Sequence, residues 1–255
     1  RFRQMVLRAK ASVESGLVPS GHVVANRRLR SYFTESSWVG EQMNGVEYLF
    51  FLRRLAEQVE ADWPSVLARL ETVRAILVSR QNLLANVTLD GENWHVFQPQ
   101  LANLLSQMPD LPVTVQNWDW KRPFQNEGLT IPAQVNYVAK GGNLYDLGYQ
   151  EHGSVSAIVN YLRTSYLWEK IRVQGGAYGA MVGFSNYTGV LSFYSYRDPN
   201  LLQTVEVYDN VAQFLQRGVS EDDLTKSIIG AISAIDSYRL PDAKGYMAMS
   251  RLLIN

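Results

Sequence analysis

Cysteine is absent from this 255-residue chain, which excludes disulfide bonds and thiolate metal sites. Neither sign of charge is in excess, because 24 basic residues are balanced by 24 acidic residues. A chain without net charge has no electrostatic attraction to nucleic acid or to an anionic membrane, so we expect neither as a partner. Apolar runs stay shorter than about 18 residues, so we expect no segment to span a membrane.

Hydrophobic residues make up 46% of the chain and charged residues 19%, which is typical of a globular protein. The length suits one large domain or two small ones. The chain begins with Arg1 rather than methionine and ends in an apolar helical pattern without a capping residue. We therefore expect it to be a fragment of a longer protein.

The first half of the chain has mainly helical patterns. The expected helices span 2–15, 46–59, 64–78 and 99–107, and a strand is expected at 83–89. The stretch 108–128 contains three prolines and two tryptophans, which indicate an irregular linker. Three arginines, Arg27, Arg28 and Arg30, are expected on a solvated face, with peptide binding as the alternative.

The second half alternates between strand and helix patterns. We expect strands at 132–140, 177–184 and 190–196, and helices at 154–170, 201–215, 220–237 and from 242 onward. Two consecutive strands joined by a tight turn must be antiparallel. This order predicts an α+β fold, with helices packed on one face of a mainly antiparallel sheet. Arg197 and Asp198 are expected to form an ion pair where the next helix starts.

Arg172 and Tyr178 flank a double glycine, Gly175 and Gly176, where the helical pattern changes to a strand pattern. Two glycines end a helix and suit a turn with positive φ. Both flanking side chains donate hydrogen bonds at neutral pH, and two donors aimed at one point can hold a carbonyl or stabilise an oxyanion. The residues alone favour the alternative, in which Arg172 is a surface charge and Tyr178 a half-buried strand residue.

Longer words then change this balance. The densest are RVQGGAYGA (172–180), SYRDPNLL (195–202) and LTKSIIGAISAIDSYRLPDAKGY (224–246). Weaker ones are SGH (20–22), EQMNGVEYL (41–49) and PAQVNYVAKGGNLYD (132–146). In this order they resemble the C-terminal half of the pitrilysin/insulysin superfamily of zinc peptidases, and most closely its presequence protease branch. The resemblance covers nearly the whole chain.

In this superfamily the zinc is held by an H-x-x-E-H motif of the N-terminal half. The histidines of this chain are His22, His95 and His152, and none is followed by Glu and His at that spacing. Each is expected to be an ordinary loop or helix residue rather than a ligand. The resemblance therefore implies zinc in the intact enzyme, with no metal bound by this chain.

The resemblance also implies roles for the glycine-flanking pair. In the family an arginine and a tyrosine of the C-terminal half reach the scissile peptide, and the matching positions are Arg172 and Tyr178. Arg172 would anchor the peptide backbone, and Tyr178 would donate a hydrogen bond to the tetrahedral oxyanion. Gly175 and Gly176 would let the substrate backbone approach. With the resemblance, the functional interpretation is favoured over the surface-residue alternative.

The implied function is the C-terminal part of a zinc-dependent metalloendopeptidase that degrades short unstructured peptides, such as cleaved targeting peptides. Its partners would be the peptide substrate and the N-terminal half of the same protein, and the fragment alone is expected to be inactive. Residues 1–128 would end the preceding repeat, and residues 129–255 would form the C-terminal α+β domain.

Two alternatives remain: a non-catalytic interaction subunit of the same fold, and a peptide-binding module without a proteolytic role. Relatives imply the bacterial cytoplasm, the mitochondrial matrix or the plastid stroma as the compartment.

Overall fold

The computed structural model describes residues 1–112, 114, 117–120 and 124–254. Contacts group the chain into two compact units, each assembled from two stretches of sequence. The first comprises Arg1–Glu57 and Asp119–Asp236, and the second comprises Gln58–Trp118 and Ser237–Asn255. The expected division into two repeats at residue 128 stays a prediction.

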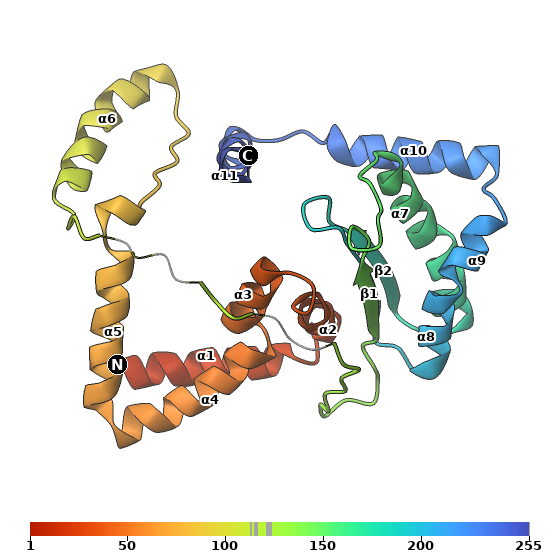
Figure 1. The fold of residues 1–255 in the computed structure, drawn as a ribbon, viewed down its shortest axis with the longest axis horizontal. Helices are drawn as coiled ribbons and strands as arrows, with labels where there is room; N and C mark the ends of the chain where they lie inside the picture. Colours follow the sequence, from red (N-terminus) through yellow and green to blue (C-terminus); the bar gives the residue numbers. More distant parts are fainter. Residues whose placement is uncertain (113, 115–116, 121–123, 255) are drawn as a thin grey trace. The chain divides into compact units, whose positions relative to one another are not determined.

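The first unit contains a small sheet with helices around it (Figure 1). Its elements in chain order are α1 (Phe2–Gly16), α2 (Gly21–Arg30), α3 (Glu35–Asn44), most of α4 (Val46–Ala61), β1 (Ala139–Asn143), α7 (Ser154–Thr164), the π-helix η2 (Trp168–Gln174), β2 (Gly179–Phe184), β3 (Val190–Tyr196), α8 (Leu202–Asp209), α9 (Val211–Gln216) and α10 (Glu221–Ile235).

The sheet has the strand order β1-β3-β2, and both strand pairs are antiparallel. β3 coincides with the predicted strand at 190–196, and β2 starts two residues later than predicted. The strand predicted at 132–140 is confirmed only at its end, where β1 begins, and is preceded by an isolated bridge between Asn136 and Asp198. The predicted α+β class with an antiparallel sheet is confirmed.

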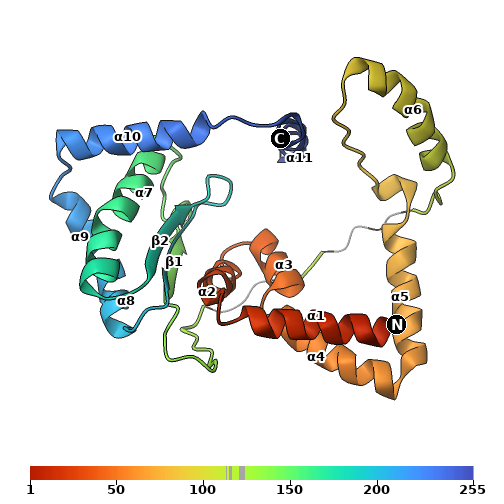
Figure 2. The same cartoon turned by 180° about the vertical axis from the view of Figure 1, so that it is seen from behind.

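One face of the sheet packs against a helical layer that contains α7, α8 and α9 (Figures 1 and 2). The buried cluster between sheet and helices consists of Val138, Leu162, Tyr166, Leu167, Ile171, Ala177, Val182, Phe193, Tyr208 and Val211. Leu167 and Ile171 are 0% and 1% exposed, so the chain just before the double glycine is anchored in this core. Burial of such side chains is the main stabilising contribution to a core of this kind.

Helix α2 contacts β1 and β3, and its residues meet the side chains that alternate with the core positions of β3. The ring centroid of His22 lies 4.6 Å from that of Tyr196 and 6.4 Å from that of Tyr194. Only glycine fits at position 21, because a Cβ there would come within 2.3 Å of the Tyr137 ring. The sheet therefore carries α2 on one face in addition to the predicted helical layer on the other.

Two predicted helices of the first unit are interrupted. The helix expected at 154–170 ends at Thr164, where the Ser165 hydroxyl donates to the Tyr161 carbonyl at 2.5 Å and the chain continues as η2. The helix expected at 201–215 is divided at Asn210, whose side-chain amide donates to the Glu206 carbonyl at 2.9 Å. Side chains that bond to the backbone in this way compete with the regular helical pattern.

The second unit is helical in the part that the structure describes. Its elements are α5 (Trp63–Leu77), a short 3-10 helix (Arg80–Asn82), α6 (Gly91–Ser106) and α11 (Pro241–Ile254). The strand predicted at 83–89 is wrong, because those residues have no regular secondary structure and the described residues of this unit offer no strand to pair with.

Helix α6 starts earlier than the predicted 99–107, since Asp90 caps it by accepting the Asn93 amide hydrogen at 2.8 Å. The predicted linker at 108–128 includes residues 113, 115–116 and 121–123, which lie outside the described residues. Its described residues contain no helix or strand. Among the helices of the described residues, none has the length and apolar character that crossing a membrane requires.

Candidate functional site

The segment that joins η2 to β2 carries the predicted pair. The π-helical turn closes through the Gly176 amide, which donates to the Arg172 carbonyl at 3.1 Å, and the Ala177 amide, which donates to the Ile171 carbonyl at 3.0 Å. Turns of this type are rare and are frequent at functional sites. Because Ile171 is anchored in the core, the backbone of its exposed neighbour Arg172 has a fixed position.

The guanidinium of Arg172 lies over an indole ring. Its central carbon is 4.0 Å from the centroid of the Trp168 ring, within the range of a cation–π interaction. Arg172 forms no ion pair or side-chain hydrogen bond with any residue that the structure describes. Its donors are therefore available to an acceptor from outside the chain.

Tyr178 is 67% exposed, although its backbone is held firmly at the start of β2. Its amide donates to the Tyr196 carbonyl at 3.0 Å. Its ring meets the Tyr196 ring edge-on, with centroids 5.6 Å apart and an interplanar angle of 86°. Edge-on aromatic pairs of this kind are favourable contacts, so the ring is braced while the phenol stays accessible.

The two glycines between the pair have local structural reasons. A Cβ at Gly175 would lie 2.6 Å from the Ile171 carbonyl oxygen, which is too close for any side chain. Gly176 has a φ of +77°, in the left-handed region that favours glycine. The double glycine therefore makes the sharp change from η2 to β2 possible, and its contact with a substrate backbone stays a prediction.

Arg172 and Tyr178 thus lie at the two ends of one tight connection, and both are exposed. Neither is covered by packed helices within the described structure, as a role in substrate binding requires. The side chains make no recorded contact with each other, and an external group would have to bring their donors together.

The histidines do not form a metal site with other residues. The described residues contain no group of three or more His, Asp or Glu side chains that could hold a metal ion. His22 lies among the aromatic rings on the α2 side of the sheet, where burial lowers its pKa. His95 and His152 are exposed, and Nδ1 of His152 is 2.8 Å from the Ser154 hydroxyl.

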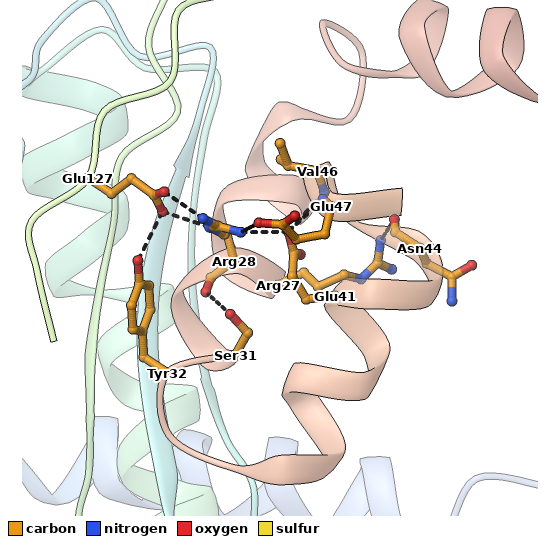
Figure 3. Close-up of polar contacts among 9 residues, drawn as sticks. All are labelled: Arg27, Arg28, Ser31, Tyr32, Glu41, Asn44, Val46, Glu47 and Glu127. Carbon is orange, nitrogen blue, oxygen red and sulfur yellow. Dashed lines mark hydrogen bonds and ion pairs between the residues drawn. The ribbon is translucent and has the colours of Figure 1, made fainter. Parts of the chain in front are cut away.

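An ion cluster that the sequence did not predict surrounds Arg28 of α2 (Figure 3). Nη1 of Arg28 is 2.9 Å from Glu47 and 3.4 Å from Glu41, while Nε and Nη2 make bonds of 2.7 and 2.6 Å to Glu127. The side chain is only 13% exposed, so the predicted solvated face is wrong for Arg28. The hydrogen bond to Glu127 is the main cause that raises the pKa of Arg28 further above its ordinary range.

Glu41 is the buried member of this cluster, with a side chain that is 0% exposed. One carboxylate oxygen accepts the Val46 amide hydrogen at 2.9 Å, while Oε2 has no hydrogen-bond partner among the described residues. Oε2 occupies the space of a Cβ at Gly45, which explains the glycine there. Burial raises the pKa of Glu41, and the Val46 amide and Arg28 oppose this effect.

A hollow of about 720 Å³ lies next to η2. Aromatic side chains of Tyr161, Tyr166, Trp168 and Phe214 contribute to its lining. Arg172 and Tyr178 are not among its lining residues, so the hollow and the predicted pair are separate features that share only the Trp168 ring.

Comparison with known families identifies the class of protein first. Residues 126–255 match the family model described as PreP C-terminal domain. Residues 1–55 match the model of the region associated with peptidases of family M16, subfamily C. An antiparallel sheet with a helical layer and these two models define a domain of the M16, or pitrilysin-type, peptidases. More particularly, the chain belongs to the PreP C-terminal domain family, whose model covers about half of it.

Curated relatives agree with this assignment. The chain is 42% identical to presequence protease 1, chloroplastic/mitochondrial, of Arabidopsis thaliana, over 100% of this chain and 24% of the relative. It is 31% identical to protein HypA of Clostridium perfringens and 23% identical to the mitochondrial presequence protease of Saccharomyces cerevisiae, over 100% and 96% of this chain and 26% of each relative. The chain thus spans about a quarter of the length of the curated relatives it matches. The predicted presequence protease resemblance is confirmed.

Proposed function

We propose that the full-length protein is an oligopeptidase that cleaves short unstructured peptides, and that this chain contributes substrate contacts from Arg172 and Tyr178. The observation that carries the proposal is the exposure of both side chains on a backbone that the core and β3 hold in place. Membership of a peptidase family supplies the reaction class. Cleaved targeting peptides are the proposed substrates, in line with the names of the presequence protease relatives.

Arg172 is proposed to bind the backbone of the peptide near the bond that is cut. A guanidinium is a rigid, planar set of donors that suits carbonyl and carboxylate oxygens. The Trp168 ring at 4.0 Å restricts its motion before substrate arrives. A group ordered in advance loses less conformational freedom on binding, which strengthens binding.

Tyr178 is proposed to donate its phenolic hydrogen to the oxyanion that forms when a peptide carbonyl is attacked. A donor fixed in advance stabilises the developing charge without reorganisation during the reaction. The bond from the Tyr178 amide to Tyr196 and the edge-on contact of the two rings provide this fixed position.

The zinc ion expected for this class fits no group of side chains among the described residues. We therefore assign zinc binding, and closure of the substrate chamber, to the N-terminal part of the full-length protein. The proposed compartment is the mitochondrial matrix, the plastid stroma or the bacterial cytoplasm, following the relatives.

The proposal is tested with the full-length protein, an unstructured peptide of about 30 residues and a folded protein of similar sequence content. We expect cleavage of the peptide alone, loss of activity with a metal chelator and recovery with added zinc. Absence of any peptide cleavage would favour the non-catalytic subunit instead. Chelator-sensitive hydrolysis by the 255-residue chain on its own would contradict the proposed division of labour.

Trp168→Ala in the full-length protein is expected to raise KM for peptide about two- to fivefold with a smaller change in kcat. Removal of the ring frees the Arg172 guanidinium, and a cation–π contact at an exposed site is worth roughly 0.5–1 kcal/mol. Trp168→Phe keeps an aromatic face and should recover most of the loss. Equal KM values for the alanine variant and the wild type would show that the ring does not prepare Arg172.

A further inference from the structure

We propose that Asn200 is a positioning residue that fixes the connection between Arg172 and Tyr178; this inference rests on the proposed function of that pair. The side-chain amide of Asn200 donates to the Gly175 carbonyl at 2.6 Å. Gly175 follows the last residue of η2, where backbone carbonyls lack partners within the helix. Asn200 supplies such a partner from a different part of the chain.

Asn200 is itself held by a buried carboxylate. Asp198 is 0% exposed, and its Oδ1 accepts the Asn200 amide hydrogen at 2.9 Å. Its Oδ2 accepts the Thr204 hydroxyl hydrogen at 2.7 Å. The backbone of Asp198 is paired with Asn136 through bonds of 2.7 and 2.9 Å. A buried carboxylate with these partners gives Asn200 a single well-defined position.

The same short segment also holds the other end of the connection. The Tyr178 amide donates to the Tyr196 carbonyl at 3.0 Å and lies 3.4 Å from the Arg197 carbonyl oxygen. Pro199 lies beside Gly176, since its Cγ is 3.7 Å from the position of a Cβ there. Residues 196–200 therefore bind the double-glycine connection at both ends.

This arrangement determines how the two proposed substrate contacts are oriented relative to each other. Arg172 precedes Gly175 by three residues, and Tyr178 follows it by three. Loss of the Asn200 bond would release the carbonyl midway between them, while the core would still hold Ile171 and β3 would still hold Tyr178. A displacement of about 1 Å at such a place can lower the rate of a positioned reaction by up to about a hundredfold.

The test uses Asn200→Ala in the full-length protein with an unstructured peptide substrate. We expect kcat to fall about tenfold, with KM within about twofold of the wild type, because the connection loses alignment rather than binding groups. Asn210→Ala is the matched control, since it also removes an asparagine amide that donates to a backbone carbonyl, at 2.9 Å, and should leave kcat unchanged.

A double-mutant cycle separates positioning from general stabilisation. In the Tyr178→Phe background, Asn200→Ala should lower kcat by less than about twofold, because the group that it positions is already inactive. A full tenfold loss in both backgrounds, or none in the wild-type background, would overturn the inference. If Tyr178→Phe alone leaves kcat unchanged, the proposed function fails instead.

A second pair of variants decides the matter if Asn200→Ala does not fold. Thr204→Val removes the hydroxyl that bonds to Asp198, and Thr204→Ser keeps it. We expect Thr204→Val to lower kcat about threefold and Thr204→Ser to match the wild type. Equal kcat values for both Thr204 variants would overturn the inference.

Discussion

Tyr178→Phe in the full-length protein is expected to lower kcat for peptide cleavage by about 10²–10³-fold, with KM nearly unchanged. The substitution removes a single oxygen that is proposed to bond only to the oxyanion. A contact made in the transition state and absent from the bound substrate changes kcat rather than affinity. Steady-state kinetics on a peptide with one cleavage site, together with an independent peptide Kd, measures both quantities.

The fold should tolerate this substitution. Tyr178 is 67% exposed, and phenylalanine preserves the edge-on contact with Tyr196 at a centroid distance of 5.6 Å. Tyr187→Phe is the matched control, because Tyr187 is 72% exposed in the turn between β2 and β3 and should show wild-type kinetics. Wild-type turnover of Tyr178→Phe would remove Tyr178 from the mechanism, and parallel losses of turnover and affinity would assign it to substrate binding instead.

The sequence predicted the hairpin well because local rules decide it. β3 was placed to the residue, since a run of aromatic and β-branched side chains is bounded by Gly189 at one end and by Asp198-Pro199 at the other. The double glycine predicted the end of η2 for the same kind of local reason, as Gly176 has a φ of +77°. The π-helical form of η2 depends on the burial of Leu167 and Ile171, which periodicity alone does not reveal.

The predicted ion pair of Arg197 and Asp198 is wrong, and the reason lies in the backbone. Arg197 has a φ of +48°, and its guanidinium carbon is 5.4 Å from the centroid of the Tyr196 ring. Asp198 faces inward and binds Asn200 and Thr204 instead. Adjacent residues of opposite charge give no information about which of them the chain will bury, so the positioning role of Asn200 required the structure.

The Arg28 cluster was missed because its contacts are distant in sequence. Arg28 and Glu127 are 99 residues apart, and no local pattern joins them. The segment E-Q-M-N-G-V-E at 41–47 held a partial indication, because it places two carboxylates around a glycine next to an arginine-rich helix. Only the observed burial of Glu41 shows that these charges pair within the protein rather than face solvent.

Arg28→Met in the full-length protein is expected to lower the free energy of opening of helices α2–α4 by about 3–5 kcal/mol at neutral pH. Methionine replaces the aliphatic part of arginine but leaves Glu41 buried without its cation, and breaking a buried pair by removal of one partner has a cost of this size. Hydrogen exchange at the Val46 amide, which donates to Glu41 at 2.9 Å, measures the change directly. Arg53→Met removes an exposed arginine that lies 2.9 Å from Glu14, and this control should cost at most about 1 kcal/mol.

The loss caused by Arg28→Met should depend on pH in one direction. Burial raises the pKa of Glu41 in the folded chain above its unfolded value, and removal of Arg28 raises it further. A folded state that binds the proton more tightly is stabilised below the unfolded pKa, and this stabilisation disappears as pH rises through the folded pKa. The deficit of Arg28→Met relative to the wild type should therefore be smaller near pH 5 than near pH 8, and adding Glu41→Gln should remove the dependence that Glu41 contributes. A deficit that stays constant over this range, or grows toward low pH, would show that Glu41 does not depend on Arg28 for its charge.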